Sequence, residues 1–188
     1  VVTAYSSMGG LWGVAFTDLI QGSLVFIGSL VAIPFALNYA GGFEHVISNL
    51  TPAQKSLTAG MGWPTIISLT IMYIASYSVG PEISQRFFSA RDSKSLMIGS
   101  LMGGLVCILY SLFPAFLGLI ASSVVKDGLL TSELLTSEGS RYILPVLAIH
   151  TMPPVIVGLL FSALISATMS SADSDMLAVS VIATNDIY

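Results

Sequence analysis

Four long apolar runs, separated by more polar stretches, dominate the chain. They cover residues 11–39, 61–81, 95–125 and 149–182. A helix needs about 20 mainly apolar residues to cross the hydrocarbon core of a bilayer. The pattern therefore predicts four transmembrane helices, of which the third and fourth are long enough to tilt or to extend beyond the bilayer.

Charged residues gather between these runs. Three of the six Lys and Arg residues, Arg86, Arg91 and Lys94, lie in the loop predicted at residues 82–94. Because cytoplasmic loops of membrane proteins carry an excess of basic residues, this loop is predicted to be cytoplasmic. The first and third helices then run outward, and the second and fourth run inward.

The composition favours an all-α integral membrane protein. Hydrophobic residues make up 54% of the sequence and charged residues only 9%, and the mean hydropathy is +0.88, whereas soluble domains carry about 25% charged residues. We therefore expect a multi-pass protein in contact with the lipid bilayer of the plasma membrane. With a net charge of −4 and no basic cluster, nucleic acid is excluded as a partner. No nucleophile is paired with a base, so no enzymatic activity is expected.

The two ends of the sequence bear on its organisation. It starts at Val1 rather than at Met, and it stops directly after the polar step ATNDIY. We expect residues 1–188 to form a single transmembrane domain fragment of a longer membrane protein.

The fourth run ends in a polar segment, SATMSSADSD, at residues 166–175, and no Asp, Glu, Lys or Arg occurs between residues 142 and 172. An ionised side chain near the middle of a bilayer costs roughly 2.5 to 3.5 kcal/mol on insertion scales, so such residues are usually functional. With about 100° per residue, one helical arc holds most of the polar groups. Its members are Ser166, Ala167, Ser170, Asp173 and Ser174, with Ser171 at the edge.

This arc has two interpretations. Hydroxyl, carboxylate and released carbonyl oxygens are the hard donors that a small alkali cation prefers. Alternatively, the serines donate to the carbonyl four residues earlier and line an interface between helices. The carboxylate of Asp173 has no such local partner, which favours the cation site.

A second acidic residue, Asp18 in FTDLIQ, lies near the predicted cytoplasmic start of the first helix, and the charge-free residues 19–38 follow it. One interpretation is a cap at the membrane interface. The other is that Asp18 faces the polar arc, because both groups lie in the cytoplasmic third of the predicted topology. Asp18 and Asp173 would then form an inner cation site or an exit path for an ion.

Several pieces of the sequence resemble the sodium:solute symporter family, which includes proline, pantothenate, sugar and choline transporters. They are YSSMGGLWGVAFTDLIQ at 5–21, GPEISQRFFSARD at 80–92, ILPVLAIHTMPPVIVGLLFSALISATMSSADSD at 143–175, and the closing NDIY. They follow the order and spacing of the family over nearly the whole chain. The resemblance implies a multi-helix transporter with an inverted-repeat core of the leucine-transporter type. This chain would supply about four of its transmembrane helices, core helices five to eight.

The resemblance also implies roles for individual residues. One sodium ion would be bound by the carbonyl of Ala167 and the hydroxyls of Ser170 and Ser171, and the remaining ligands would come from a first core helix that is not among these 188 residues. Some relatives hold a second sodium. Its positions correspond to Asp18, Ser170, Asp173 and Ser174.

The second apolar run would be a core helix whose middle lines the substrate cavity. At the depth of this cavity the run carries three polar or aromatic residues, Ser76, Tyr77 and Ser78. They directly precede a Gly-Pro step that is typical of a broken helix. These residues are therefore candidates for binding the solute. The alternative is that Tyr77 anchors the helix at the membrane interface.

The expected function is secondary active transport, in which sodium drives the symport of a small organic solute across the membrane by alternating access. Coupling requires that sodium binds the two states with unequal affinity. Domains resembling these symporters also occur fused to histidine kinases. A membrane sensor domain of such a kinase is therefore the alternative function.

Overall fold

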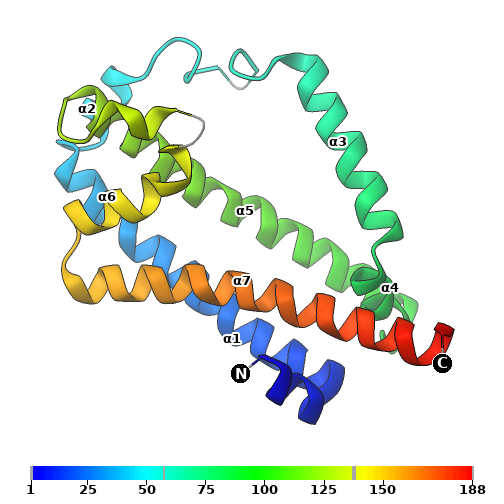
Figure 1. Ribbon diagram of the computed structural model, residues 1–188. Coiled ribbons are helices and arrows are strands. Elements are labelled where there is room, and N and C mark those ends of the chain that lie inside the picture. The colour runs from blue at the N-terminus through cyan, green and yellow to red at the C-terminus, as the bar shows by residue number, and fades with distance from the viewer. Residues whose placement is uncertain (1, 57, 137–138, 188) are drawn as a thin grey trace. The chain divides into compact units, whose positions relative to one another are not determined.

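The computed structural model describes residues 2–56, 58–136 and 139–187, and the regular elements in these ranges are all helical (Figure 1). The prediction of an all-α protein is therefore confirmed for this part of the chain. The α-helices are α1 (Val2–Tyr39), α2 (Phe43–Asn49), α3 (Gly62–Val79), α4 (Pro81–Phe88), α5 (Ser93–Lys126), α6 (Ile143–Thr151) and α7 (Pro154–Ile182). Two 3-10 turns, Ser132–Leu135 and Gly139–Tyr142, and a π-helical turn, Ala183–Ile187, complete the described elements.

Three helical stretches are long and apolar enough to cross a membrane: Met8–Tyr39, Ser93–Lys126 and Pro154–Asn185. Helices α3 and α4 pass the same test only as a pair, and they are bent by 54° at the break between them. The described residues thus contain three candidate spans, or four if the bent pair counts as one.

Gly10 interrupts α1 with a backbone conformation that helices do not contain. Its φ is 53° and its ψ is −149°, a region open to glycine and strained for residues with a Cβ atom. The uninterrupted helix resumes at Leu11, the residue at which the hydrophobic pattern places the start of the first span.

The segment 82–94, expected as a loop, contains the short helix α4. Pro81 occupies the first helical position, where its missing N–H has no cost, and Gly80 precedes it in an extended conformation. No Gly or Pro follows before Gly99, and the helix continues to Phe88. Of the three basic residues that indicated the membrane orientation, Arg86 lies on α4 and Lys94 on α5, whereas Arg91 lies in the bend between them.

The fourth apolar run, expected as one helix over 149–182, is divided in the structure. Helix α6 ends at Thr151, Met152 is extended, and α7 begins at Pro154. Pro153 causes the division because a residue before proline avoids the helical conformation and proline itself has no N–H.

These helices contribute to two compact units. Unit 1 contains Val1–Ser23, Gly62–Val106 and Ile165–Tyr188, and unit 2 contains Leu24–Met61 and Cys107–Leu164.

Unit 2 has an apolar core in which small residues of α1, and Ala40 directly after it, face larger neighbours. Ala32, Ala36 and Ala40 are buried at intervals of four residues, and they cluster with Leu117 and Ile120 of α5. At Gly28 an added Cβ would lie 3.0 Å from the Cβ of Ala163. Small residues at this spacing let helices approach closely, which is how membrane helices gain packing energy.

Unit 1 is different because it buries few of its described side chains. Helices α3 and α4 bury none, and the buried side chains of the unit are Val14, Ala178 and the acidic Asp173. A carboxylate is thus among the most buried groups of this unit. Polar contacts rather than an apolar core connect its helices.

Candidate cation site

Asp18 of α1 and Ser170 of α7, both in unit 1, lie side by side in the structure. The hydroxyl of Ser170 donates to Asp18 Oδ1 at 2.5 Å, across 152 positions of the chain. The side chain of Asp18 is only 17% exposed. An acid of one candidate span thus meets a hydroxyl of another.

Arg86 of α4 contacts the same pair. Its Nη2 donates to Asp18 Oδ2 at 2.7 Å and to Ser174 Oγ at 2.6 Å. Figure 1 shows α4 at the end of α3, beside the C-terminal part of α7. Sequence reasoning used Arg86 only to orient the membrane topology. Arg86 lies in GPEISQRFFSARD, close to the predicted cytoplasmic ends of the first and fourth spans. This position in the sequence could have indicated a contact between Arg86 and Asp18.

Asp173, the residue before Ser174, is fully buried at 0% exposure, and it is not without a partner. Its burial places a carboxylate inside unit 1, on the helix that also supplies Ser170 and Ser174. Burying a carboxylate is unfavourable unless hydrogen bonds or a cation compensate for its lost hydration. The carboxylates of Asp18 and Asp173 in unit 1 thus lie on the two helices that Arg86 contacts.

Gln21 is a residue that the sequence did not single out. Its Oε1 is buried and, among the described residues, has no hydrogen-bond partner. Gln21 follows Asp18 by three positions, so the two side chains leave α1 on the same side, about one turn apart. An unsatisfied buried acceptor is uncommon in native proteins and calls for an explanation.

Ser171 and Ala167, two of the three expected sodium ligands, are exposed on α7. The hydroxyl of Ser171 donates to the carbonyl of Ala167 at 3.4 Å, as the helix-interface interpretation expects. Neighbouring residues on a helix point about 100° apart, so Ser171 does not join Ser170 at Asp18. The structure therefore separates the expected ligands into an exposed pair and the partly buried Ser170.

A cleft of about 360 Å³ lies next to the Asp18–Arg86 pair, entirely within unit 1. Asp18 and Arg86 are the two charged residues of its lining. The cleft leaves room beside the ion pair for water or for a small ion. Its other lining residues are Leu11, Trp12, Val14, Ala15 and Ser89.

The candidate solute-binding residues Ser76, Tyr77 and Ser78 are exposed on α3. Ser78 donates its hydroxyl to the carbonyl of Ile74 at 2.7 Å, and the ring centroid of Tyr77 lies 6.3 Å from that of Tyr73. The cleft is lined by other residues. The structure thus does not bring these three residues to the Asp18 site, and their role stays a prediction.

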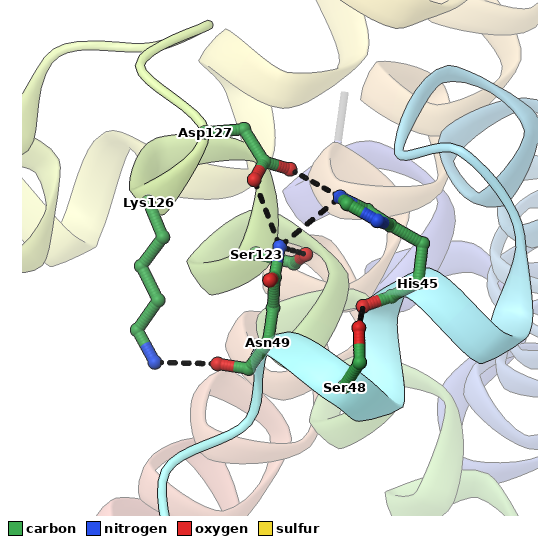
Figure 2. A network of polar contacts seen from close by, with 6 residues as sticks. All are labelled: His45, Ser48, Asn49, Ser123, Lys126 and Asp127. Carbon is green, nitrogen blue, oxygen red and sulfur yellow. Dashed lines mark hydrogen bonds and ion pairs between the residues drawn. The ribbon is translucent and has the colours of Figure 1, made fainter.

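A second polar network belongs to unit 2 and connects α2 with the end of α5 (Figure 2). His45 Nε2 lies 2.9 Å from Asp127 Oδ2, and Asn49 donates its amide to Asp127 Oδ1 at 2.8 Å and to Ser123 Oγ at 2.9 Å. Lys126 Nζ donates to the carbonyl of Asn49 at 2.7 Å. These bonds fasten a short helix to a long one.

The protonation pattern of this network follows from its geometry. His45 Nε2 must carry a hydrogen to bond the carboxylate of Asp127, and a nitrogen that carries a hydrogen cannot accept one from Asn49. The two amide hydrogens of Asn49 are therefore donated to Asp127 and Ser123. The hydrogen bond from His45 is the main cause that lowers the pKa of Asp127 from its ordinary value. The bond from Asn49 lowers it further, and partial burial opposes both. Asp127 is thus a stable anion in this network.

The helices and the buried acid Asp173 define an integral membrane protein with a polar site inside its apolar segments. Its sequence agrees with one family: the profile of the Sodium:solute symporter family matches residues 1–188. The chain belongs to the sodium:solute symporter family, as its sequence motifs predicted.

Three relatives illustrate the range of this similarity. The chain is 27% identical to the sodium/pantothenate symporter of Haemophilus influenzae and 30% identical to the osmoregulated proline transporter of Bacillus subtilis, over 100% of its own length and 38% of theirs. It is 26% identical to the high affinity choline transporter 1 of Homo sapiens, over 100% of its length and 33% of the relative. No solved structure matches the chain significantly.

The chain spans 38% of the length of the first two of these relatives. All three are named as symporters or transporters, in agreement with the expectation that the chain is not an enzyme. Their names do not favour the alternative of a kinase sensor domain.

Proposed function

We propose that this chain forms part of a secondary active transporter, in which a sodium gradient drives the symport of a small organic solute by alternating access. Membership of the sodium:solute symporter family supports the proposal. So do the relatives named for transport of pantothenate, proline and choline. The different solutes in these names leave the solute of this protein open among small organic molecules.

The observation that carries the proposal is the contact of 2.5 Å between Asp18 and Ser170. It joins oxygen atoms of two apolar helices at a place where an acid is costly unless it has a cation to bind. A cationic group, the guanidinium of Arg86, already lies there at 2.7 Å. This part of unit 1 is therefore suited to a positive charge.

The oxygen atoms present fit a sodium ion. Hard cations are bound by carboxylate, hydroxyl and amide oxygens. Gln21 Oε1 is buried and unsatisfied among the described residues, and leaving such an acceptor without a partner costs about 1 to 3 kcal/mol. A sodium ion would use this oxygen. We therefore add Gln21 to the inner cation site or exit path formed by Asp18, Ser170, Asp173 and Ser174.

The coupling sodium is proposed to bind at the other set of expected ligands, which consists of Ala167, Ser170 and Ser171. The exposure of Ala167 and Ser171 supports this assignment, because exposed positions of α7 can face ligands from a further helix. The bond between them is long, at 3.4 Å, and such a weak bond can be exchanged for a sodium ion at little cost. Ser170 borders both sets and would connect the coupling site with the exit path.

The remaining assignments follow the family resemblance. We propose that the chain supplies core helices five to eight of an inverted-repeat core of the leucine-transporter type, and that other helices of the full-length protein complete it. Ser76, Tyr77 and Ser78 would line the solute cavity, and their exposure on α3 leaves them available for it. The protein would reside in the plasma membrane, with Arg86 on the cytoplasmic side.

Uptake into proteoliposomes that contain the full-length protein tests this function. Amino acids, vitamins, sugars, carboxylates and choline-like cations are offered under an inward sodium gradient, and separately under a potassium gradient of equal size. We expect at least one solute to accumulate with sodium and not with potassium. Equal accumulation under both gradients, or none for any solute class, would contradict sodium symport.

A further inference from the structure

We propose that Arg86 is a tethered cation that competes with sodium for Asp18, so that the guanidinium and the sodium ion alternate at the inner cation site. This inference rests on the proposed function and assigns a role to a residue outside the expected ligand sets. Arg86 closes the exit path while it is bound to Asp18, and it expels the ion when it returns.

The geometry of Arg86 is that of a substitute ion. A single nitrogen, Nη2, bonds Asp18 Oδ2 at 2.7 Å and Ser174 Oγ at 2.6 Å, so it lies between two oxygens that also belong to the candidate cation site. Ser170 occupies the other carboxylate oxygen, Oδ1. A sodium ion at this position would be repelled by the positive guanidinium, and the two cations therefore compete for the same oxygens.

The charge of Arg86 cannot be removed by a proton transfer, because a guanidinium remains protonated at every physiological pH. Release of Asp18 therefore requires that Arg86 moves. The side chain is 51% exposed, and its helix, α4, buries no residue. Arg86 can withdraw without opening an apolar core, and the break at Gly80 lies between α4 and the long helix α3.

The cleft beside the pair provides the space for this exchange. Asp18 and Arg86 both line it, and its volume of about 360 Å³ is large enough for an ion with several waters. When Arg86 withdraws, the carboxylate of Asp18 faces a hydrated space. Sodium can then leave its protein ligands for water without crossing the apolar interior.

Equilibrium binding of radioactive sodium to the purified full-length protein measures the competition without requiring transport. If Arg86 occupies Asp18 in about nine of ten molecules, its removal lowers the apparent dissociation constant for sodium about tenfold. We expect this change in Arg86→Gln, and a smaller one in Arg86→Lys, because an ammonium on a shorter stem bonds Asp18 and Ser174 less well. Arg91→Gln removes a basic residue of the same segment outside the cleft and should leave sodium binding unchanged.

The second measurement is solute uptake against sodium on the cytoplasmic side. In Arg86→Gln the ion leaves slowly, so internal sodium should inhibit uptake at about tenfold lower concentration. Combining Arg86→Gln with Asp18→Asn should abolish the gain in sodium affinity, because the contested carboxylate is gone. If Arg86→Gln does not fold, Arg86→Lys carries the same test.

The outcomes separate this inference from the proposed function. Wild-type protein that binds no sodium would contradict both. Wild-type protein that binds sodium, with unchanged or weakened binding in Arg86→Gln and Arg86→Lys, would overturn only the competition. A lower unfolding temperature with unchanged sodium affinity would assign Arg86 a purely structural role.

Discussion

Arg86 and Asp18 form an ion pair with an N–O distance of 2.7 Å across 68 positions of the chain. The pair joins a membrane helix to a segment that was expected to be a loop. The guanidinium balances the charge of an acid that lies in an otherwise apolar segment. The same acid also accepts a hydrogen bond from the hydroxyl of Ser170. In the proposed exchange, the acid becomes available to a sodium ion only when Arg86 withdraws.

Neutralising Asp18 should affect ion release more than solute binding. In Asp18→Asn we expect the maximal uptake rate to fall about tenfold, which corresponds to ~1.4 kcal/mol, while the half-saturating solute concentration changes little. The physical reason is that the amide cannot attract the departing ion. Uptake measured against solute concentration at saturating sodium gives both values.

Asp175→Asn serves as the control for this prediction, because Asp175 is an exposed acid of α7 that points away from the polar arc. Its uptake rate should resemble that of the wild type. A loss of solute affinity in Asp18→Asn as large as the loss of rate would count against a role in ion release.

Replacing Gln21 separates a ligand from a structural residue. In Gln21→Leu an unsatisfied buried oxygen disappears, so the unfolding temperature should stay the same or rise. Sodium affinity should nevertheless fall, by about tenfold if one good ligand is worth ~1.4 kcal/mol. Thermal unfolding and sodium binding are measured on the same sample.

Gln54→Leu should show the opposite pattern. The amide of Gln54 donates to Ser122 at 2.8 Å in unit 2, so its loss should lower the unfolding temperature and leave sodium affinity unchanged. If Gln21→Leu lowers the unfolding temperature without changing sodium affinity, Gln21 is not an ion ligand.

Gly10 should tolerate no side chain. Its φ of 53° and ψ of −149° make Gly10→Ala unfavourable by about 1 to 3 kcal/mol, although no neighbouring atom obstructs the new methyl group. Gly9→Ala places the same methyl in equally open space within the helix and should be neutral or slightly stabilising. Thermal unfolding of the two variants checks the difference. Equal unfolding temperatures would show that the chain does not need this break.

The contact between α2 and α5 should withstand moderate acid. Because the folded state lowers the pKa of Asp127, its contribution to stability is complete above the ordinary carboxylate pKa of about 4 and is lost only as the pH falls through the lower folded value. Hydrogen exchange of Phe43–Asn49, corrected for the intrinsic rate, should show constant protection from about pH 8 down to about pH 5.

Two variants complete this test. Asp127→Asn should reduce the protection of α2 at every pH, and Glu133→Gln, at an exposed acid of the following segment, should not. Loss of protection near pH 6.5, about the ordinary pKa of histidine, would indicate that the charge of His45 rather than that of Asp127 controls the contact.

The sequence was sufficient to predict the helices because their cause is local. Apolar runs long enough to cross a bilayer need no partner to be recognised, and α5 (Ser93–Lys126) contains the predicted third span. The short helix that begins at Pro81 was not predicted, because a hydropathy pattern does not resolve a helix of a few residues between two apolar runs.

The candidate site could be predicted only in part. The polar arc and Asp18 were visible, since acids are rare in apolar runs, and helical periodicity placed Ser170 on the side that now contacts Asp18. The roles of Arg86 and Gln21 depend on which helices lie together in unit 1. That arrangement is set by tertiary contacts between positions 68 or more residues apart, and no pattern within one helix reports it.

Sodium coupling in the proposed transporter depends on the serines of α7, and the sodium dependence of solute uptake tests their role most directly. In the full-length protein, Ser170→Ala and Ser171→Ala should each raise the half-saturating sodium concentration about tenfold, the effect of ~1.4 kcal/mol per lost ligand. Ser180→Ala is the matched control, because Ser180 is exposed on the same helix and donates to the carbonyl of Met176 at 2.8 Å. It should behave as the wild type. Unchanged sodium dependence in both Ser170→Ala and Ser171→Ala would contradict the proposal that these serines bind the coupling sodium.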